Sequence, residues 1–177
     1  MPAHIEWPEH FLPGTTDNFV SNEVIVKDLT VDEAWRLLVH PALWESYYDN
    51  CSQITPPSPD GVLKKGRMFS FATFGFPPME MTVYESVEPT PTSPGRLAWR
   101  ATVNDGENVV LDVYHAWIVE KLDWGVVRIL TQESQLGKPA VEMAKTKPNR
   151  VLLKHQDWLD GIVAKAREDR GKAGDGE

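Results

Sequence analysis

The sequence predicts an α+β domain in which a curved antiparallel sheet of about six to seven strands wraps around a long C-terminal helix, with two short helices after the first strand. A β-branched segment is followed directly by two short helical patterns, and residues 67–136 consist mostly of alternating segments divided by turns. The end of the chain changes to a period of three and four residues. Consecutive strands with tight turns form a meander, and the single amphipathic helix has to cover its concave face.

Composition and charge limit the class of protein. The chain has 177 residues and a formal net charge of -8, which repels phosphate backbones, so we expect no nucleic-acid partner. No apolar run approaches the roughly 20 residues of a membrane span, and the first residues have no signal-peptide pattern. The expected location is therefore cytoplasmic. The single cysteine, Cys51, cannot form an internal disulfide.

The first elements are an extended arm, a strand and two short helices. Residues 1–20 are rich in proline and aromatic residues without periodicity, which indicates an arm docked on the domain. The β-branched run 23–29 predicts the first strand. Thr30 and Glu33 form a capping-box pattern that predicts a helix start, and Pro41 marks the start of a second short helix.

Strand patterns fill the middle of the chain. Residues 104–106 and 123–125 have the composition of hairpin turns, and residues 89–95 form a longer proline-rich turn. The predicted strands are residues 67–74, 79–87, 96–103, 109–121 and 126–136.

A long amphipathic helix closes the domain. Pro148 is expected to kink or restart it after an approach segment that begins near Pro139, because proline removes a helix hydrogen bond. Residues 170–177 carry no apolar anchor, so we expect a disordered tail after a single domain of residues 21–169. The apolar stripe of the helix contains Leu152, His155, Leu159, Ile162 and Ala166.

Two details of the sequence match a known family at the same positions. One is the block LTVDEAWRLLVHPALWESYY at residues 29–48. The other is LAWR, DVYHAW and VRILTQESQLG within residues 97–137, followed by HQDWLDGI at residues 155–162. Over residues 20–168 the chain resembles the SRPBCC superfamily, whose helix-grip fold is shared by START lipid-transfer domains, the birch pollen allergen family and polyketide cyclase/dehydrase proteins. The polyketide cyclase/dehydrase branch is the one it resembles most. The resemblance implies a mainly apolar cavity between sheet and long helix, opening near residues 60–66.

Alternation along two strands places polar residues on the side of this cavity. His115 and Trp117 share the inward face of one predicted strand, and Thr131 and Glu133 share that of the next. A hairpin centred near Trp124 places His115 opposite Glu133 and Trp117 opposite Thr131, unless a bulge shifts the register.

Three polar candidates thus converge on one cavity: His115, Glu133 and, from the helix stripe, His155. A buried carboxylate can orient an imidazole and raise its pKa toward neutrality, so His115 and Glu133 form a candidate catalytic acid/base pair. The alternatives are that each residue makes a core hydrogen bond, or that Glu133 points to solvent. The same three residues suit a metal ion, but the i, i+4 spacing of a helical metal site is missing. We therefore expect no metal and no other cofactor.

Residues on the inward faces are the candidate ligand contacts. Aromatic and methionine side chains suit an adaptable pocket for a flat or lipid-like molecule, and they suit an ordinary core equally well. The turn 74–78 is either a lip at the pocket rim or a homodimer contact. The predicted ligand-binding residues are Phe69, Phe71, Met79, Met81, Leu97, Trp99, Val113, Trp117, Thr131, His155 and Leu159.

Three functions from different classes remain open. The first is binding of a hydrophobic small molecule such as a lipid, a polyketide or an aromatic metabolite. The second is a cyclase or dehydratase that moves a proton with His115 and Glu133. The third is a protein-interaction module without a ligand, which a filled cavity would favour.

Overall fold

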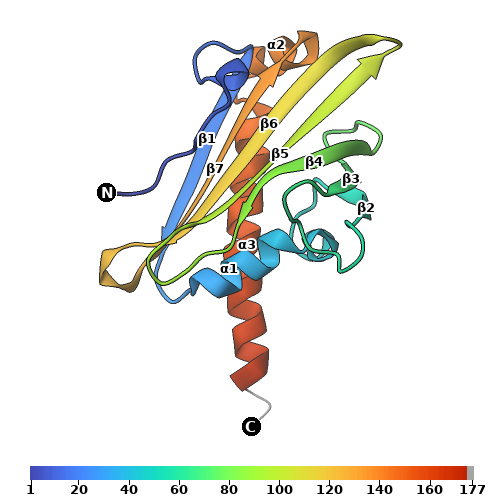
Figure 1. Ribbon diagram of the computed structural model, residues 1–177. Coiled ribbons are helices and arrows are strands. Elements are labelled where there is room, and N and C mark those ends of the chain that lie inside the picture. The colour runs from blue at the N-terminus through green and yellow to red at the C-terminus, as the bar shows by residue number, and fades with distance from the viewer. Residues whose placement is uncertain (175–177) are drawn as a thin grey trace.

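Seven antiparallel strands form one curved sheet, and the helix α3 (Arg150–Gly174) lies against its inner face (Figure 1). The structure, a computed structural model, describes residues 1–174. The strand order is β1-β7-β6-β5-β4-β3-β2, so consecutive strands from β2 to β7 are neighbours and β1 pairs with β7. The strands are β1 (Asn18–Val26), β2 (Ser52–Thr55), β3 (Met68–Ala72), β4 (Met79–Val87), β5 (Gly95–Asp105), β6 (Asn108–Lys121) and β7 (Val127–Leu136).

The predicted α+β fold and its order of elements are confirmed, and two details of the sheet differ. The short edge strand β2 was not predicted, because four mostly exposed residues show no apolar alternation. Strand β1 runs from Asn18 to Val26, whereas residues 23–29 were predicted. It starts earlier because Asn18 already pairs with Gln135, and the Asn18 side-chain amide donates to the Gln135 side chain at 2.8 Å. The N-terminal arm therefore covers residues 1–17.

The first helix, α1 (Val31–Val39), starts where the capping box predicts. The Thr30 hydroxyl accepts a hydrogen bond from the backbone N–H of Glu33 at 3.2 Å, and the Glu33 carboxylate accepts one from the Thr30 N–H at 2.7 Å. The second short helix is the 3-10 helix η2 (Pro41–Ser46), which begins at its proline.

At the C-terminal end, α2 (Lys138–Lys145) and α3 are separate helices with Pro148 between them, as expected. Helix α3 continues to Gly174, so the expected disordered tail is wrong for residues 170–174, while residues 175–177 lie outside the described residues. The physical reason is Arg170, whose guanidinium donates to the Glu33 carboxylate at 2.9 Å and to the Asp28 carbonyl at 2.6 Å. These contacts tie the last turns of α3 to the start of α1.

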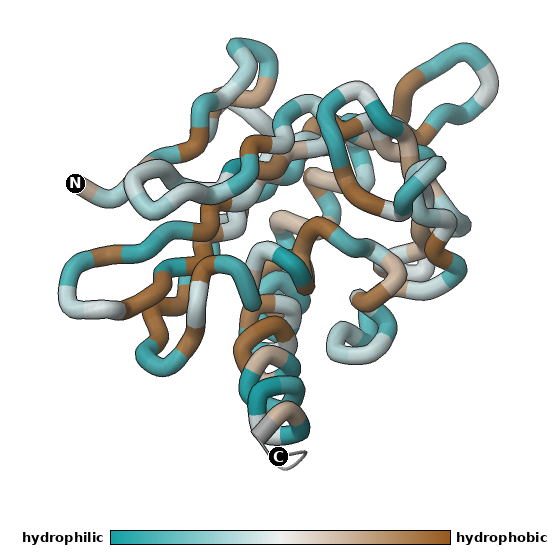
Figure 2. The backbone as a smooth tube through the Cα atoms, turned by 60° about the horizontal axis from the view of Figure 1, so that its bottom comes forward, coloured by the Kyte–Doolittle hydropathy of each residue, from teal (hydrophilic) through white to brown (hydrophobic). Residues whose placement is uncertain are grey.

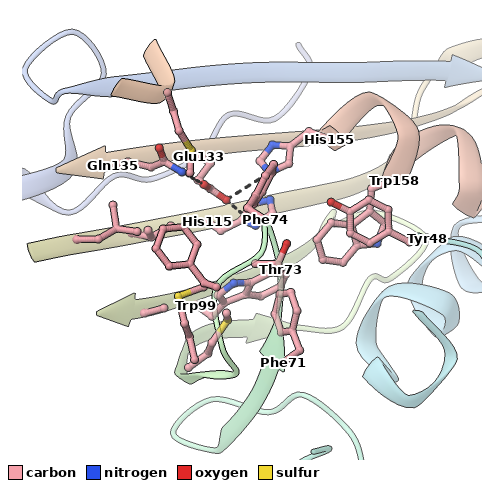
Figure 3. A pocket seen from close by; sticks show the side chains of 17 residues that line it. Tyr48, Phe71, Thr73, Phe74, Trp99, His115, Glu133, Gln135, His155 and Trp158 are labelled. Atoms are coloured by element: carbon pink, nitrogen blue, oxygen red, sulfur yellow. Dashed lines mark hydrogen bonds and ion pairs between the residues drawn. The ribbon is translucent and has the colours of Figure 1, made fainter. Parts of the chain in front are cut away.

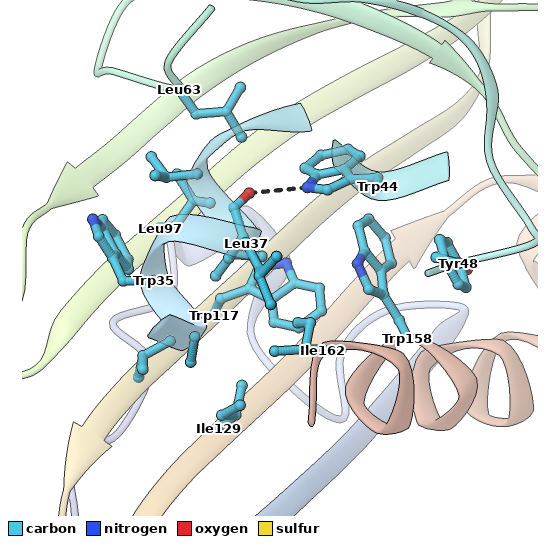
Figure 4. Packing of buried hydrophobic residues seen from close by; sticks show 14 of the residues in the cluster. Trp35, Leu37, Trp44, Tyr48, Leu63, Leu97, Trp117, Ile129, Trp158 and Ile162 are labelled. Atoms are coloured by element: carbon cyan, nitrogen blue, oxygen red, sulfur yellow. Dashed lines mark hydrogen bonds between the residues drawn. The ribbon is translucent and has the colours of Figure 1, made fainter. Parts of the chain in front are cut away.

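The main core lies between the sheet and the helices α1 and α3 (Figure 4). The rings of Trp44 and Trp158 meet edge to face with centroids 4.8 Å apart, and Leu37, Trp117 and Ile162 pack in the same buried cluster. Hydrophobic and hydrophilic residues alternate along α3, as one buried face requires (Figure 2). In the described part of the chain, no helix has the length and apolar character needed to cross a membrane.

The N-terminal arm, residues 1–17, covers the outer face of the sheet. Ile5 and Phe11, the latter in the 3-10 helix η1 (Glu9–Phe11), are buried in a cluster with Tyr114 of β6. The Ala3 N–H donates to the Glu120 carboxylate, with N–O distances of 3.1 and 3.2 Å. Strand β6 is therefore buried on both faces along most of its length.

Candidate functional site

Strands β6 and β7 bring His115 and Glu133 together. Their register pairs His115 with Glu133 and Trp117 with Thr131, which confirms the pairing predicted from a hairpin centred near Trp124. The turn between the strands is the 3-10 segment η3 (Asp123–Gly125).

His155 joins this pair from α3 (Figure 3). The Nδ1 atom of His115 lies 3.1 Å from Oε2 of Glu133, and Nε2 of His155 lies 3.3 Å from the same oxygen. The other carboxylate oxygen accepts a hydrogen bond from the Gln135 side chain. On its far side, the His115 ring shares a 2.7 Å hydrogen bond with the Thr131 hydroxyl. We call His115, Glu133 and His155 the His–Glu–His cluster.

The His–Glu–His cluster is withdrawn from solvent. His115, Glu133 and His155 are 2%, 6% and 1% exposed. The two imidazole rings stack with their centroids 4.4 Å apart and an angle of 9° between their planes, and the indole of Trp99 meets the His115 ring at 4.7 Å. Among the residues that the structure describes, none forms a hydrogen bond with Nδ1 of His155.

Burial sets the charge of this site. It lowers the pKa of His115 to about 3, because the imidazolium loses its hydration and lies beside His155, and the Glu133 carboxylate does not compensate. Glu133 acts to raise this pKa, as expected, but burial and His155 outweigh it, so the pKa does not rise toward neutrality. Burial acts to raise the pKa of Glu133, but the two imidazoles and the Gln135 amide outweigh it and lower the pKa overall. Near pH 7 the site thus holds a buried carboxylate beside a neutral His115 ring.

The cluster borders a narrow cavity of about 40 Å³ between the sheet, α2 and α3. This volume is enough for roughly three water-sized groups, whereas pockets for drug-sized ligands measure roughly 300–1,000 Å³. The lining residues are Tyr48, Phe71, Thr73, Phe74, Phe76, Met79, Met81, Trp99, Ala101, Leu111, Val113, His115, Glu133, Gln135, Met143, His155 and Trp158.

Only part of the predicted ligand-binding set reaches this cavity. Phe71, Met79, Met81, Trp99, Val113 and His155 line it, together with the predicted catalytic pair His115 and Glu133. The other five residues do not line it: four of them pack in the main core, and Thr131 contacts the far side of His115. They are Phe69, Leu97, Trp117, Thr131 and Leu159.

Several lining residues were missed, and three of them had a detectable signal. Ala101 and Gln135 continue the inward alternation by one step beyond Trp99 and Glu133, and Trp158 follows His155 at helical spacing. Met143 on α2 had no such signal. The other missed lining residues, apart from Phe74 and Phe76 of the turn, are Tyr48, Thr73 and Leu111.

The residues that the family resemblance placed at the cavity opening do not line the cavity. Phe74 and Phe76, from the turn between β3 and β4, lie on its wall, which agrees with the interpretation of that turn as a rim. Asp60 and Gly61, expected at the opening, line a separate surface hollow beside Arg36.

Comparison with known proteins supports the fold. Neither a protein-family model nor a curated protein matches the chain. Norcoclaurine synthase from Thalictrum flavum, solved as a point mutant with a transition-state analogue, is 12% identical over 86% of this chain and 96% of that chain, with a TM-score of 0.60. The di-domain ARO/CYC protein BexL from the BE-7585A biosynthetic pathway is 15% identical over 82% of this chain and 45% of that chain, with a TM-score of 0.55. At these identities the likeness extends to the helix-grip fold alone.

A third solved structure is much more similar. Hypothetical protein jhp0584 from Helicobacter pylori is 47% identical over 94% of this chain and 98% of that chain, with a TM-score of 0.86. Such identity over nearly the whole of both chains indicates common descent, and the chain therefore belongs to the same family as hypothetical protein jhp0584.

Proposed function

We propose that this protein binds a small, mainly apolar molecule between the sheet and α3, with a polar group of that molecule held by the His–Glu–His cluster. One observation carries the proposal: a buried carboxylate and two buried imidazoles border a cavity whose other walls are mostly aromatic and methionine side chains. Burying charge in an apolar setting is costly, and a domain that needed only a packed core would place apolar residues there. A ligand with one polar end matches both kinds of wall.

The size of the cavity restricts the ligand or requires the rim to move. Phe74 and Phe76 border the cavity from the turn, and Met143 borders it from the short helix α2. Rotation of these three side chains would enlarge the space without disturbing the sheet, and methionine adapts readily to new shapes. A single aromatic ring with a polar substituent fits this arrangement better than a long lipid chain does. Two structures with the same fold are biosynthetic proteins by name, which agrees with a small-molecule ligand.

Native mass spectrometry of the purified protein, combined with organic extraction of the same sample, tests the proposal. We expect a small molecule that leaves on denaturation, and binding of an added apolar fluorescent probe, anilinonaphthalene sulfonate, to the extracted protein. The variant Ala101→Leu places a larger side chain in the cavity, and its matched control Thr102→Leu changes the next residue, which faces outward. We expect binding to be lost in the first variant and retained in the second.

Equal probe binding by both variants, with no extracted molecule, would contradict a ligand site in this cavity. That result would favour the reading of the protein as an interaction module without a ligand.

A second candidate function is proton transfer to or from the bound molecule, as in a cyclase or dehydratase. The 3.1 Å distance between Nδ1 of His115 and the Glu133 carboxylate favours it. Its weakness is the low pKa of His115, because a general base is most effective when its pKa lies near the working pH. Turnover of the extracted molecule by the wild type, and its loss in His115→Gln with binding retained, would establish this activity.

A further inference from the structure

We infer that the His–Glu–His cluster is a binding site for a divalent transition-metal ion of the Zn²⁺ or Fe²⁺ type. His115, Glu133 and His155 each offer one donor atom, and these three atoms all lie within 4.8 Å of one another. Two imidazoles and one carboxylate are a donor set with which proteins hold Zn²⁺ and non-haem Fe²⁺ while leaving coordination positions open. Ca²⁺ and Mg²⁺ require mainly oxygen donors, so the two imidazoles argue against them.

The distances between donor atoms support this assignment. Ligands bound to one ion at about 2.1 Å are roughly 3.0–3.4 Å apart in octahedral or tetrahedral geometry. The separations from Oε2 of Glu133 to the nearest ring nitrogens of His115 and His155 are 3.1 and 3.3 Å. Two of the three edges of the coordination triangle therefore already have the length that a bound ion requires.

The neighbours of the cluster orient its donors as metal sites require. Thr131 holds the Nε2 side of the His115 ring, which leaves Nδ1 directed at Glu133. Gln135 donates to one oxygen of Glu133 and leaves the other oxygen between the two histidines. Outer partners of this kind fix the tautomer and orientation of metal ligands. Both partners come from β7, so the same strand supplies a ligand and its supports.

One adjustment is needed for the ion to bind. The imidazole planes are stacked at 9°, so their lone pairs meet at one point only if a ring turns. His155 is the ring able to turn, because it borders the cavity and its Nδ1 atom has no hydrogen bond to lose within residues 1–174. The cavity beside it then provides the open positions for water or for a polar group of a bound molecule. The site does not depend on the ligand proposed above.

Metal titration of the full-length protein tests the inference. After treatment with a chelator, the protein is incubated with Co²⁺ or Zn²⁺, and binding is followed by the visible absorption of Co²⁺ and by the metal content after desalting. We expect one ion per chain and a rise in melting temperature with Zn²⁺. We expect Glu133→Gln, which keeps the size of the side chain, to lower the affinity at least 100-fold, and Thr131→Val to lower it about 10-fold.

The other histidines supply the control. His4, His10 and His40 lie outside the cluster, so His10→Gln and His40→Gln should bind as the wild type does. Circular dichroism of each variant separates loss of binding from loss of folding, and X-ray absorption of the wild type should count two imidazole ligands. Binding that survives Glu133→Gln, binding lost in His10→Gln or His40→Gln, or no stoichiometric binding by the folded wild type would overturn the inference. None of these outcomes alters the extraction experiment, so the two proposals fail separately.

Discussion

Gly161 lies where α3 meets the end of η2. Its replacement by alanine should destabilise the fold, although this substitution usually stabilises a helix. A Cβ atom at Gly161 would lie 2.2 Å from the carbonyl oxygen of Tyr47 and 3.1 Å from its ring. Tyr47 cannot easily move aside, since its N–H donates to the Trp44 carbonyl at 3.0 Å and its hydroxyl to the Leu37 carbonyl at 2.8 Å. Alanine would normally stabilise a helix interior by about 1 kcal/mol relative to glycine. Overpacking costs about 1–3 kcal/mol, and a 2.2 Å approach to a backbone oxygen belongs at the upper end of that range, so the cost exceeds the gain by about 2 kcal/mol.

We therefore expect Gly161→Ala to lower the free energy of unfolding by about 2 kcal/mol. The matched control is Gly171→Ala in the same helix, where an added Cβ meets no atom within 4 Å. Because Gly171 lies near the end of the helix, that change should leave the free energy of unfolding unchanged or raise it by about 0.5 kcal/mol. Urea unfolding followed by tryptophan fluorescence measures both. If Gly161→Ala proved as stable as Gly171→Ala, the close approach of α3 to η2 would be refuted.

Two further predictions concern the ends of the chain. The Arg170 guanidinium, with the capping contacts from Thr30, lowers the pKa of Glu33 from 4.5 to about 2. The stability that results from this shift is present above pH 4.5 and is lost as the pH falls from 4.5 toward 2. Because both side chains are partly exposed, the effect is about 1 kcal/mol, and Arg170→Met should flatten this acid dependence in urea unfolding at several pH values. Phe11→Ala removes a ring that is 2% exposed and should lower the free energy of unfolding by about 3 kcal/mol. The variant should also speed proteolysis of the arm. An unchanged cleavage rate would show that Phe11 does not anchor the arm.

Alternation along the strands predicted which side chains face inward, but not how far along each strand the cavity extends. Leu97 pairs with Trp117, and the next inward pair along the same strands is Trp99 with His115. Both pairs share one face, yet the cavity begins only at the second pair. The boundary is set by where Trp158 and η2 close over the sheet, which involves contacts between residues far apart in the sequence. No local sequence pattern indicates the position along the strands at which the cavity begins.

The register of the His115 and Glu133 pair was predictable, and its electrostatics was not. The turn residues near Trp124 and the alternation on both sides fix the pairing locally. The low pKa of His115 follows from complete burial beneath the aromatic core, which depends on the whole fold. The same limit applies to the metal site, because its donors come from two strands and a helix instead of from one helical turn.

The covered outer face has a kinetic consequence. Contacts between the N-terminal arm and the sheet join residues more than a hundred positions apart, as Ala3 and Glu120 do. The arm therefore has no docking surface until β6 and β7 have paired, and it is the natural last step of folding. By the same reasoning it is the first segment to detach. Its amide hydrogens should exchange through a local opening far less costly than global unfolding, while those of β6 exchange only when the whole sheet opens.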